Sequence, residues 1–181
     1  MLAFLDASDH LEYIGVVLCP VDMRLSFYNY VKENIGYVHM HELSRKSRIK
    51  AIQRFEKCLQ LHKDKVKLFS ISTQFKSIIS SKRGERKPST LVRKKANKAL
   101  AKSLLMFFQE NKVSEYFIDD EFIVVFNEVN RYPRRHYLIC LADIVAWIDN
   151  RQIKTGQYKG KRIDSMVAHL DIGEKVKSYY K

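Results

Sequence analysis

Leu2-Ala3-Phe4-Leu5-Asp6 opens the chain as a short apolar run that ends in one acid, and a second apolar run follows from Tyr13 to Cys19. Continuous apolar runs are typical of central strands that are covered on both faces. We therefore predict strands over 2–6 and 12–19, joined as an antiparallel hairpin because the spacer is short. Asp6 then lies at a strand tip, where a carboxylate either binds a divalent cation or simply opens the turn.

The rest of the chain alternates between predicted helices and strands. Helices are predicted over 22–34, 44–62, 91–110 and around Asp143, and strands over 37–41, 66–72 and 115–118. This order predicts the α/β class, with a five-stranded mixed sheet and helices on both faces. We expect a single domain over 1–181, with its core at about 2–150. Residues 151–181 are expected to form a C-terminal extension that mixes a basic loop with short helices.

The composition is that of a folded protein, with 46% hydrophobic and 12% aromatic residues. No apolar run reaches the roughly 18 residues that a membrane-spanning helix needs, so we expect no membrane partner. The N-terminus has no basic region ahead of its apolar stretch, so we expect no secretory signal. Three widely spaced cysteines, Cys19, Cys58 and Cys140, predict buried free thiols in a reducing compartment, and hence a cytoplasmic protein.

The net charge of +13 indicates a polyanionic partner, most often a nucleic acid. Between Lys76 and Lys102 there are ten basic residues and one acid. A basic loop that leads into a basic helix face is typical of contact with a phosphate backbone, although an ordinary solvated loop has the same composition. No aromatic residue is interleaved in the loop, so base stacking is not indicated there. The predicted nucleic-acid contacts are Arg45, Arg48, Lys82, Arg83, Arg86, Lys87, Arg93, Lys94, Lys95, Arg134 and Arg135.

Several acids occupy positions that suit a metal site. Asp143 has apolar neighbours, and a buried carboxylate is costly unless it is paired or binds a metal; alternatively, it caps its helix. Glu42 precedes the 44–62 helix, where the helix dipole alone also favours an acid. Asp119 and Asp120 follow an apolar run, as Asp6 does, and either of them also suits a turn. Acids that converge at one end of a sheet require cations, and two Mg²⁺ or Mn²⁺ ions there would support phosphodiester hydrolysis.

Other chemistries have weaker signals. His39 and His41 alternate with apolar residues and are interpreted as polar strand residues, although His41 is near enough to Glu42 in sequence to assist a metal. Cys140 and His136 offer a nucleophile and a base. A cysteine inside an apolar run has a raised pKa, however, and is unreactive.

The motifs Asp6-Ala7-Ser8-Asp9 and Ala142-Asp143-Ile144-Val145-Ala146 resemble those of an uncharacterised family in the ribonuclease H-like superfamily. Its members open with a strand that ends in Asp-x-Ser-Gly and close with an Ala-Asp-(Ile/Leu)-(Ile/Val)-Ala helix. His39-Met40-His41-Glu42-Leu43 and Phe117-Ile118-Asp119-Asp120 resemble its segments that contribute a Glu and a later Asp. The resemblance covers about residues 2–150 and implies a ribonuclease H-like fold.

Two departures from the family pattern stand out. Asp9 occupies the position of the family's glycine. Many ribonuclease H-like nucleases also carry an acid at the end of the fourth strand, where this chain has Ser70-Ile71-Ser72-Thr73. Asp119, on the strand that follows, is the candidate substitute.

Together, the resemblance and the charge predict a Mg²⁺- or Mn²⁺-dependent nuclease that acts on RNA or an RNA/DNA duplex. Its catalytic residues and metal ligands would be Asp6, Glu42, Asp119 and Asp143. Two alternatives remain: a non-catalytic nucleic-acid-binding protein on the same scaffold, and an interaction subunit whose basic face meets an acidic partner.

Overall fold

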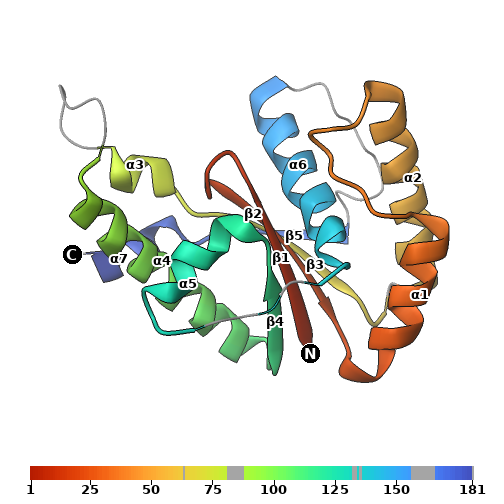
Figure 1. Cartoon of the computed structure of the whole chain (residues 1–181), viewed down its shortest axis with the longest axis horizontal. Coiled ribbons are helices and arrows are strands. Elements are labelled where there is room, and N and C mark those ends of the chain that lie inside the picture. Colours follow the sequence, from red (N-terminus) through yellow and green to blue (C-terminus); the bar gives the residue numbers. More distant parts are fainter. Residues whose placement is uncertain (63, 81–87, 132–133, 135, 156–165, 181) are drawn as a thin grey trace.

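The computed structural model describes residues 1–62, 64–80, 88–131, 134, 136–155 and 166–180. A five-stranded mixed sheet lies at its centre (Figure 1). The strands are β1 (Leu2–Ser8), β2 (Tyr13–Cys19), β3 (Lys67–Ser72), β4 (Glu115–Ile118) and β5 (Val167–Asp171), in the spatial order β4-β1-β2-β3-β5. β1, β2 and β3 are successively antiparallel, β4 is parallel to β1, and β5 is parallel to β3. The predicted α/β class and mixed sheet are confirmed.

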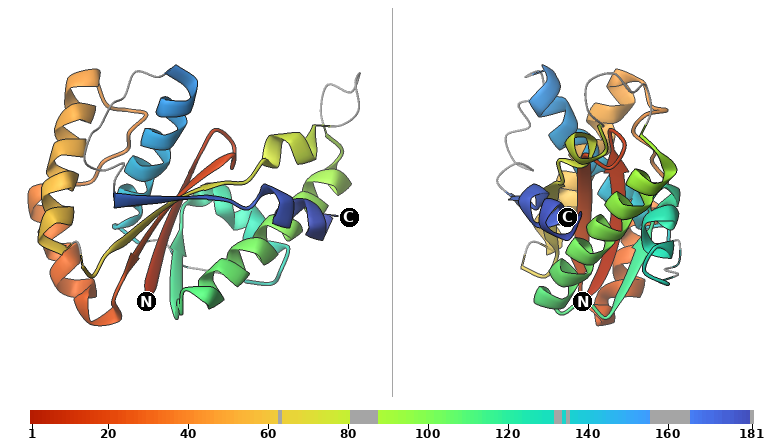
Figure 2. Two further views of the ribbon diagram at one scale, coloured as in Figure 1. Left: turned by 180° about the vertical axis from the view of Figure 1, so that it is seen from behind. Right: turned by 90° about the vertical axis from the view of Figure 1, so that its left-hand side faces the viewer.

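Helices cover both faces of this sheet, as the two further views show (Figure 2). One face carries α1 (Arg24–Asn34), α2 (Arg45–His62) and α6 (Ile139–Thr155). The other carries α3 (Phe75–Ile79), α4 (Thr90–Glu110), α5 (Ile123–Asn127) and α7 (Gly173–Tyr180). Two short 3₁₀ helices, η1 (Val21–Met23) and η2 (Asp120–Phe122), precede α1 and α5.

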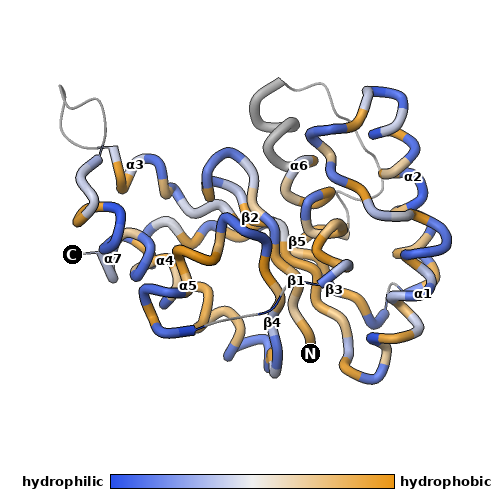
Figure 3. The backbone as a smooth tube through the Cα atoms, viewed as in Figure 1, coloured by the Kyte–Doolittle hydropathy of each residue, from blue (hydrophilic) through white to orange (hydrophobic). Residues whose placement is uncertain are grey.

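Alternate residues of β1 belong to two separate hydrophobic clusters, because successive side chains of a strand point to opposite faces. Leu2 and Phe4 join the cluster under α1, α2 and α6, whereas Ala3 and Leu5 join the cluster on the other face. The hydropathy colouring shows mostly hydrophobic central strands between helices in which hydrophobic and hydrophilic residues alternate (Figure 3). Asp6 continues the alternation of Leu2 and Phe4 and therefore faces α6.

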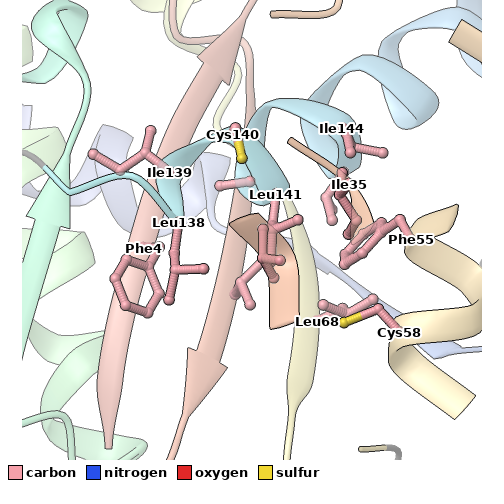
Figure 4. Packing of buried hydrophobic residues seen from close by; sticks show 14 of the residues in the cluster. Phe4, Ile35, Phe55, Cys58, Leu68, Leu138, Ile139, Cys140, Leu141 and Ile144 are labelled. Carbon is pink, nitrogen blue, oxygen red and sulfur yellow. The ribbon is translucent and has the colours of Figure 1, made fainter. Parts of the chain in front are cut away.

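Helix α6 begins directly above the first strand. Leu138 and Leu141, at its start, lie in the same cluster as Phe4 of β1 and Phe55 of α2 (Figure 4). The three cysteines are buried free thiols, as predicted.

The predicted strand over 37–41 is wrong, because this segment forms a turn before α2. Val38 and Met40 are buried while their neighbours are more exposed, so the alternation arises from a turn that packs against α6. As a result, β3 is the third strand in sequence and β4 is the fourth. The fifth strand, β5, lies within the expected C-terminal extension, and Val176 of α7 is part of the core.

The β1–β2 hairpin closes through a left-handed turn. Asp9, His10 and Leu11 have φ angles of +59°, +57° and +67°. Each such residue other than glycine costs about 1–2 kcal/mol, so the turn depends on contacts that hold it. In the described part of the chain, every helix is too short or too polar to span a lipid bilayer.

Candidate functional site

Asp6 is a buried acid near the carboxyl end of β1, and only 5% of its surface is exposed. It does not lie at the predicted strand tip, because β1 continues for two more residues, to Ser8. Its Oδ1 accepts a hydrogen bond from the backbone N–H of Ala7 at 2.6 Å. Burial, and after it the nearby carboxylates of Asp143 and Asp119, together raise the pKa of Asp6 to about 9, although the hydrogen bond from the Ala7 amide opposes them. Without a compensating cation, the Asp6 carboxyl is therefore protonated near neutral pH.

Asp143 is the second buried acid, with 3% of its surface exposed. Helix α6 begins at Ile139, so Asp143 lies one turn inside it and does not cap its N-terminus. Its Oδ2 accepts the Met40 backbone N–H at 2.6 Å and lies 3.2 Å from Nδ1 of His39. Burial raises the pKa of Asp143, while the Met40 amide and the histidines His39 and His41 lower it.

A glycine on β2 allows α6 to approach Asp6 closely. Gly15 is the partner of Asp6 in the antiparallel register of β1 and β2. A Cβ atom at Gly15 would overlap the carbonyl oxygen of Ala142 and would lie 2.6 Å from the backbone nitrogen of Ala146. The backbone of α6 thus rests on the backbone of β2 beside Asp6, and this contact brings Asp143 to Asp6.

Arg48 of α2 holds the turn that carries the hydrogen-bond partners of Asp143. Its Nε donates to the Met40 carbonyl oxygen at 2.7 Å, and its Nη2 donates to the His41 carbonyl oxygen at 3.1 Å. Its guanidinium carbon lies 5.4 Å from the centre of the Trp147 ring. Arg48, predicted from the sequence to contact phosphate, therefore has a positioning role beside the buried acids.

Two further acids follow the neighbouring strand β4. The backbone N–H of Asp119 donates to the Leu5 carbonyl oxygen at 3.2 Å, which places Asp119 beside the end of β1. Glu121 lies at the rim; partial burial raises its pKa, His10 and His41 lower it, and Asp119 raises it. Asp120 is exposed. Of the two candidates for the third acid, Asp119 is the one close to Asp6.

Of these groups, Asp6, Asp119 and Glu121 line one cavity of about 480 Å³, whereas Asp143 and Arg48 are absent from its described lining. Its charged and titratable lining includes Asp6, His10, His39, His41, Asp119 and Glu121. Trp147, one helical turn after Asp143, closes one side of the cavity. Such a cavity combines acids with groups that can carry a proton or bind a cation.

Glu42 is the predicted ligand that the structure leaves apart from this cluster. Its side chain is exposed, and Glu42 is not one of the described residues that line the cavity. The helix begins three residues later, at Arg45. Sequence reasoning missed Glu121, which reaches the cavity because η2 turns the chain directly after β4. Only the cluster of three acids at 119–121 signalled it.

Apart from Arg48, which is half-buried, the predicted nucleic-acid contacts divide into two groups. Five are exposed in the structure: Arg45, Arg93, Lys94, Lys95 and Arg134. Five lie outside the described residues: Lys82, Arg83, Arg86, Lys87 and Arg135.

The Cys140–His136 pair has the properties of core residues. Burial raises the pKa of the Cys140 thiol to about 12, as expected for an unreactive cysteine. The centre of the His136 ring lies 5.0 Å from that of Phe4 and 4.9 Å from that of Phe117. Burial lowers the pKa of His136.

Carboxylate oxygens are the ligands that Mg²⁺ and Mn²⁺ prefer, so the donor chemistry of Asp6, Asp119 and Asp143 fits either ion. The mutual repulsion that raises the pKa of Asp6 is also what a cation would relieve. Within the described ranges, no group of three or more Asp, Glu, His or Cys side chains has a geometry that could hold a metal ion as it stands. Comparisons with known protein families, curated proteins and solved structures give no match to this chain.

Proposed function

We propose that this protein is a ribonuclease H-like, divalent-metal-dependent nuclease that hydrolyses phosphodiester bonds in RNA or in an RNA/DNA duplex. The observation that carries the proposal is the pair of buried acids, Asp6 of β1 and Asp143 of α6, which lie far apart in the sequence and close together in the fold. Burying two neighbouring acids costs folding free energy, so a functional role is the simplest reason for the pair. Their surroundings raise both pKa values, as is common in active sites.

Asp6, Asp119 and Asp143 would hold Mg²⁺ or Mn²⁺ in this site, as one ion or two. The bound metal would activate a water molecule and stabilise the leaving oxygen. The chain's own groups orient the ligands: the Met40 amide fixes one oxygen of Asp143, and the Ala7 amide fixes one oxygen of Asp6. His39 lies against Asp143, and 41% of its side chain is exposed to solvent.

Two features of the fold support the ribonuclease H-like part of the proposal. Asp119 directly follows β4, the fourth strand in sequence, where the resemblance implies an acid. Asp9 has a φ of +59°, a conformation that suits the family's glycine and that Asp tolerates better than most residues. Asp119 and Asp9 therefore each suit the role of the family residue that this chain lacks.

The net charge of +13 and the exposed basic residues support a polyanionic substrate. They support equally a protein that binds nucleic acid without cleaving it.

The test is cleavage of labelled single-stranded RNA, single-stranded DNA and RNA/DNA hybrid, with Mn²⁺ or with EDTA. Wild type is compared with Asp6→Asn and with the control Asp64→Asn, which makes the same chemical change at an exposed turn position. Metal-dependent cleavage that Asp6→Asn loses and Asp64→Asn keeps is expected.

Cleavage that survives both EDTA and Asp6→Asn would contradict the mechanism. Binding without cleavage, weakened steeply by salt, would identify a non-catalytic nucleic-acid-binding protein. A lack of salt-dependent binding to every nucleic acid would leave the hypothesis of an acidic protein partner.

A further inference from the structure

A second cavity, of about 490 Å³, adjoins the carboxylate cavity. The two cavities share His10 and Glu121 in their linings. The second one lies where the hairpin turn meets α3, α4 and α5, on the face of the sheet opposite α6. A ligand bound over His10 would therefore enter both.

The second cavity differs from the first in chemistry. Its apolar wall comes from the turn and from α3 and α5: Leu11, Phe75, Ile79 and Val124. Val124 is 56% exposed and belongs to the open side of this wall. The α4 side adds the guanidinium of Arg93 and the amide of Asn97. The acidic cavity thus continues into one that is apolar on one wall and positively charged on another.

Arg93 is the cation that is available to a ligand. The other lining cation, Lys76, is engaged, because its Nζ lies 2.6 Å from Oδ1 of Asp9. Arg93 is exposed, and the described residues provide no ion-pair partner for it. Its planar guanidinium is suited to bidentate contact with a phosphate group.

The wall between the two cavities is held in place. The strained turn at 9–11 is fixed by the Lys76–Asp9 ion pair, by the Lys76 backbone N–H donating to Oε2 of Glu12 at 2.8 Å, and by Thr73. Thr73 Oγ1 donates to the Leu11 carbonyl oxygen at 2.6 Å. Because left-handed residues persist only where surrounding contacts hold them, His10 has a defined position between the cavities.

We propose that the second cavity takes an unpaired nucleotide of a single-stranded nucleic acid, next to the phosphate that reacts at the carboxylate cavity. Arg93 binds the phosphate of this nucleotide, the apolar wall contacts its base, and Asn97 meets the base edge. The inference rests on the proposed function, which supplies the neighbouring reacting phosphate. A base enters a walled cavity only when it is unstacked and unpaired, so the preferred substrate is a single strand. The volume is within the range of small-ligand sites.

The experiment measures binding of a fluorescent eight-nucleotide single-stranded RNA by anisotropy, in the full-length Asp6→Asn protein so that the probe stays intact. Arg93→Ala should weaken binding about tenfold, the expected loss of one hydrogen-bonded charge contact. Lys98→Ala removes the same charge from an exposed position of α4 that lines neither cavity, and should weaken binding less than about twofold. Arg93→Lys should fall between the two.

Val124→Asp provides a second variant, since its exposed site tolerates a polar residue and an acid there would repel phosphate. It should reduce single-strand binding by several fold. The protein with an unaltered second cavity should bind the same RNA more weakly as a duplex than as a single strand. Arg93→Ala should remove most of this preference for the single strand. Circular dichroism checks that each variant is folded.

Equal losses in Arg93→Ala and Lys98→Ala, or duplex binding as tight as single-strand binding, would overturn the inference. The outcome is separate from that of the proposed function. Binding through Arg93 in a protein that cleaves nothing would refute the nuclease and keep the nucleotide site. Cleavage by wild type together with normal binding by Arg93→Ala would refute the nucleotide site alone.

Discussion

Asp6 and Asp143 are buried between the sheet and α6, whereas Asp119 and Glu121 lie on the more exposed side of the cavity that Asp6 lines. The two deep acids are fixed by backbone amides, and burial is the largest cause of their raised pKa values. Glu121, at the rim, is close to the histidines His10 and His41 and to solvent. We therefore expect the deep pair to be essential for the proposed chemistry and Glu121, at the rim, only to adjust it.

The largest expected effect on cleavage distinguishes the buried acids Asp6 and Asp143 from Glu121 at the rim. Asp6→Asn should lower metal-dependent cleavage by at least about 100-fold, because the variant loses the carboxylate charge with which Asp6 would bind the cation. Glu121→Gln should lower it less than about fivefold. Single-turnover rates on one RNA substrate make the comparison, and similar losses in the two variants would break the distinction between deep and rim acids.

The next effect concerns the contact that creates the deep pair. Gly15→Ala places a methyl group into the backbone of α6 at Ala142 and Ala146. It should lower the free energy of unfolding by about 1–3 kcal/mol, the usual cost of overpacking, and should reduce cleavage as Asp143 moves away from Asp6. Urea denaturation measures the first effect. A variant with unchanged stability and activity would show that α6 does not depend on this glycine.

Arg48→Ala tests whether the turn at 39–41 positions Asp143. Loss of its two hydrogen bonds to Met40 and His41 should lower kcat by about tenfold and leave KM nearly unchanged, as for residues that orient ligands. Lys46→Ala removes an exposed cation two residues earlier in the same helix and serves as the control. A rise in KM with an unchanged kcat would instead assign Arg48 to phosphate binding.

The pH dependence of stability gives a smaller and graded effect. Unfolded Asp6 releases its proton near its ordinary pKa of 3.8, whereas the folded protein retains it until about pH 9. The free energy of unfolding of the metal-free protein should therefore fall as pH rises from about 4 to 9, with at most about 1.4 kcal/mol per pH unit from this group. Asp6→Asn removes this contribution, so its stability relative to wild type should increase with pH. Urea denaturation in EDTA at pH 5 to 8 measures it, and a constant difference would contradict the assigned pKa.

Much of the deep pair could be predicted from sequence, because each acid interrupts or ends an apolar run. The run at 2–6 lies within β1 and includes the buried Asp6, although the strand continues to Ser8, and Asp143 lies inside an apolar helix. These are local signals. Burial of the intervening apolar residues determines the strand and the helix, so the acids among them are buried as well.

The rim could not be predicted in the same way, since it depends on how turns pack. Alternation at 37–41 resembles a strand, but it comes from Val38 and Met40 packing under a turn. Glu42 has the helix-dipole signal of a first-turn acid, yet α2 begins at Arg45 and its side chain is exposed. β5 was missed because it lies at the sheet edge and is mostly exposed, so its apolar pattern is weak.

The measurement that tests the central claim most directly is Mn²⁺ binding by the full-length protein at pH 8, followed by electron paramagnetic resonance. Wild type and Asp64→Asn should bind Mn²⁺ with equal affinity, and Asp6→Asn should bind it at least about tenfold more weakly. Equal affinity in Asp6→Asn, or no binding by wild type, would contradict the claim that the buried acids Asp6 and Asp143 form a divalent-cation site.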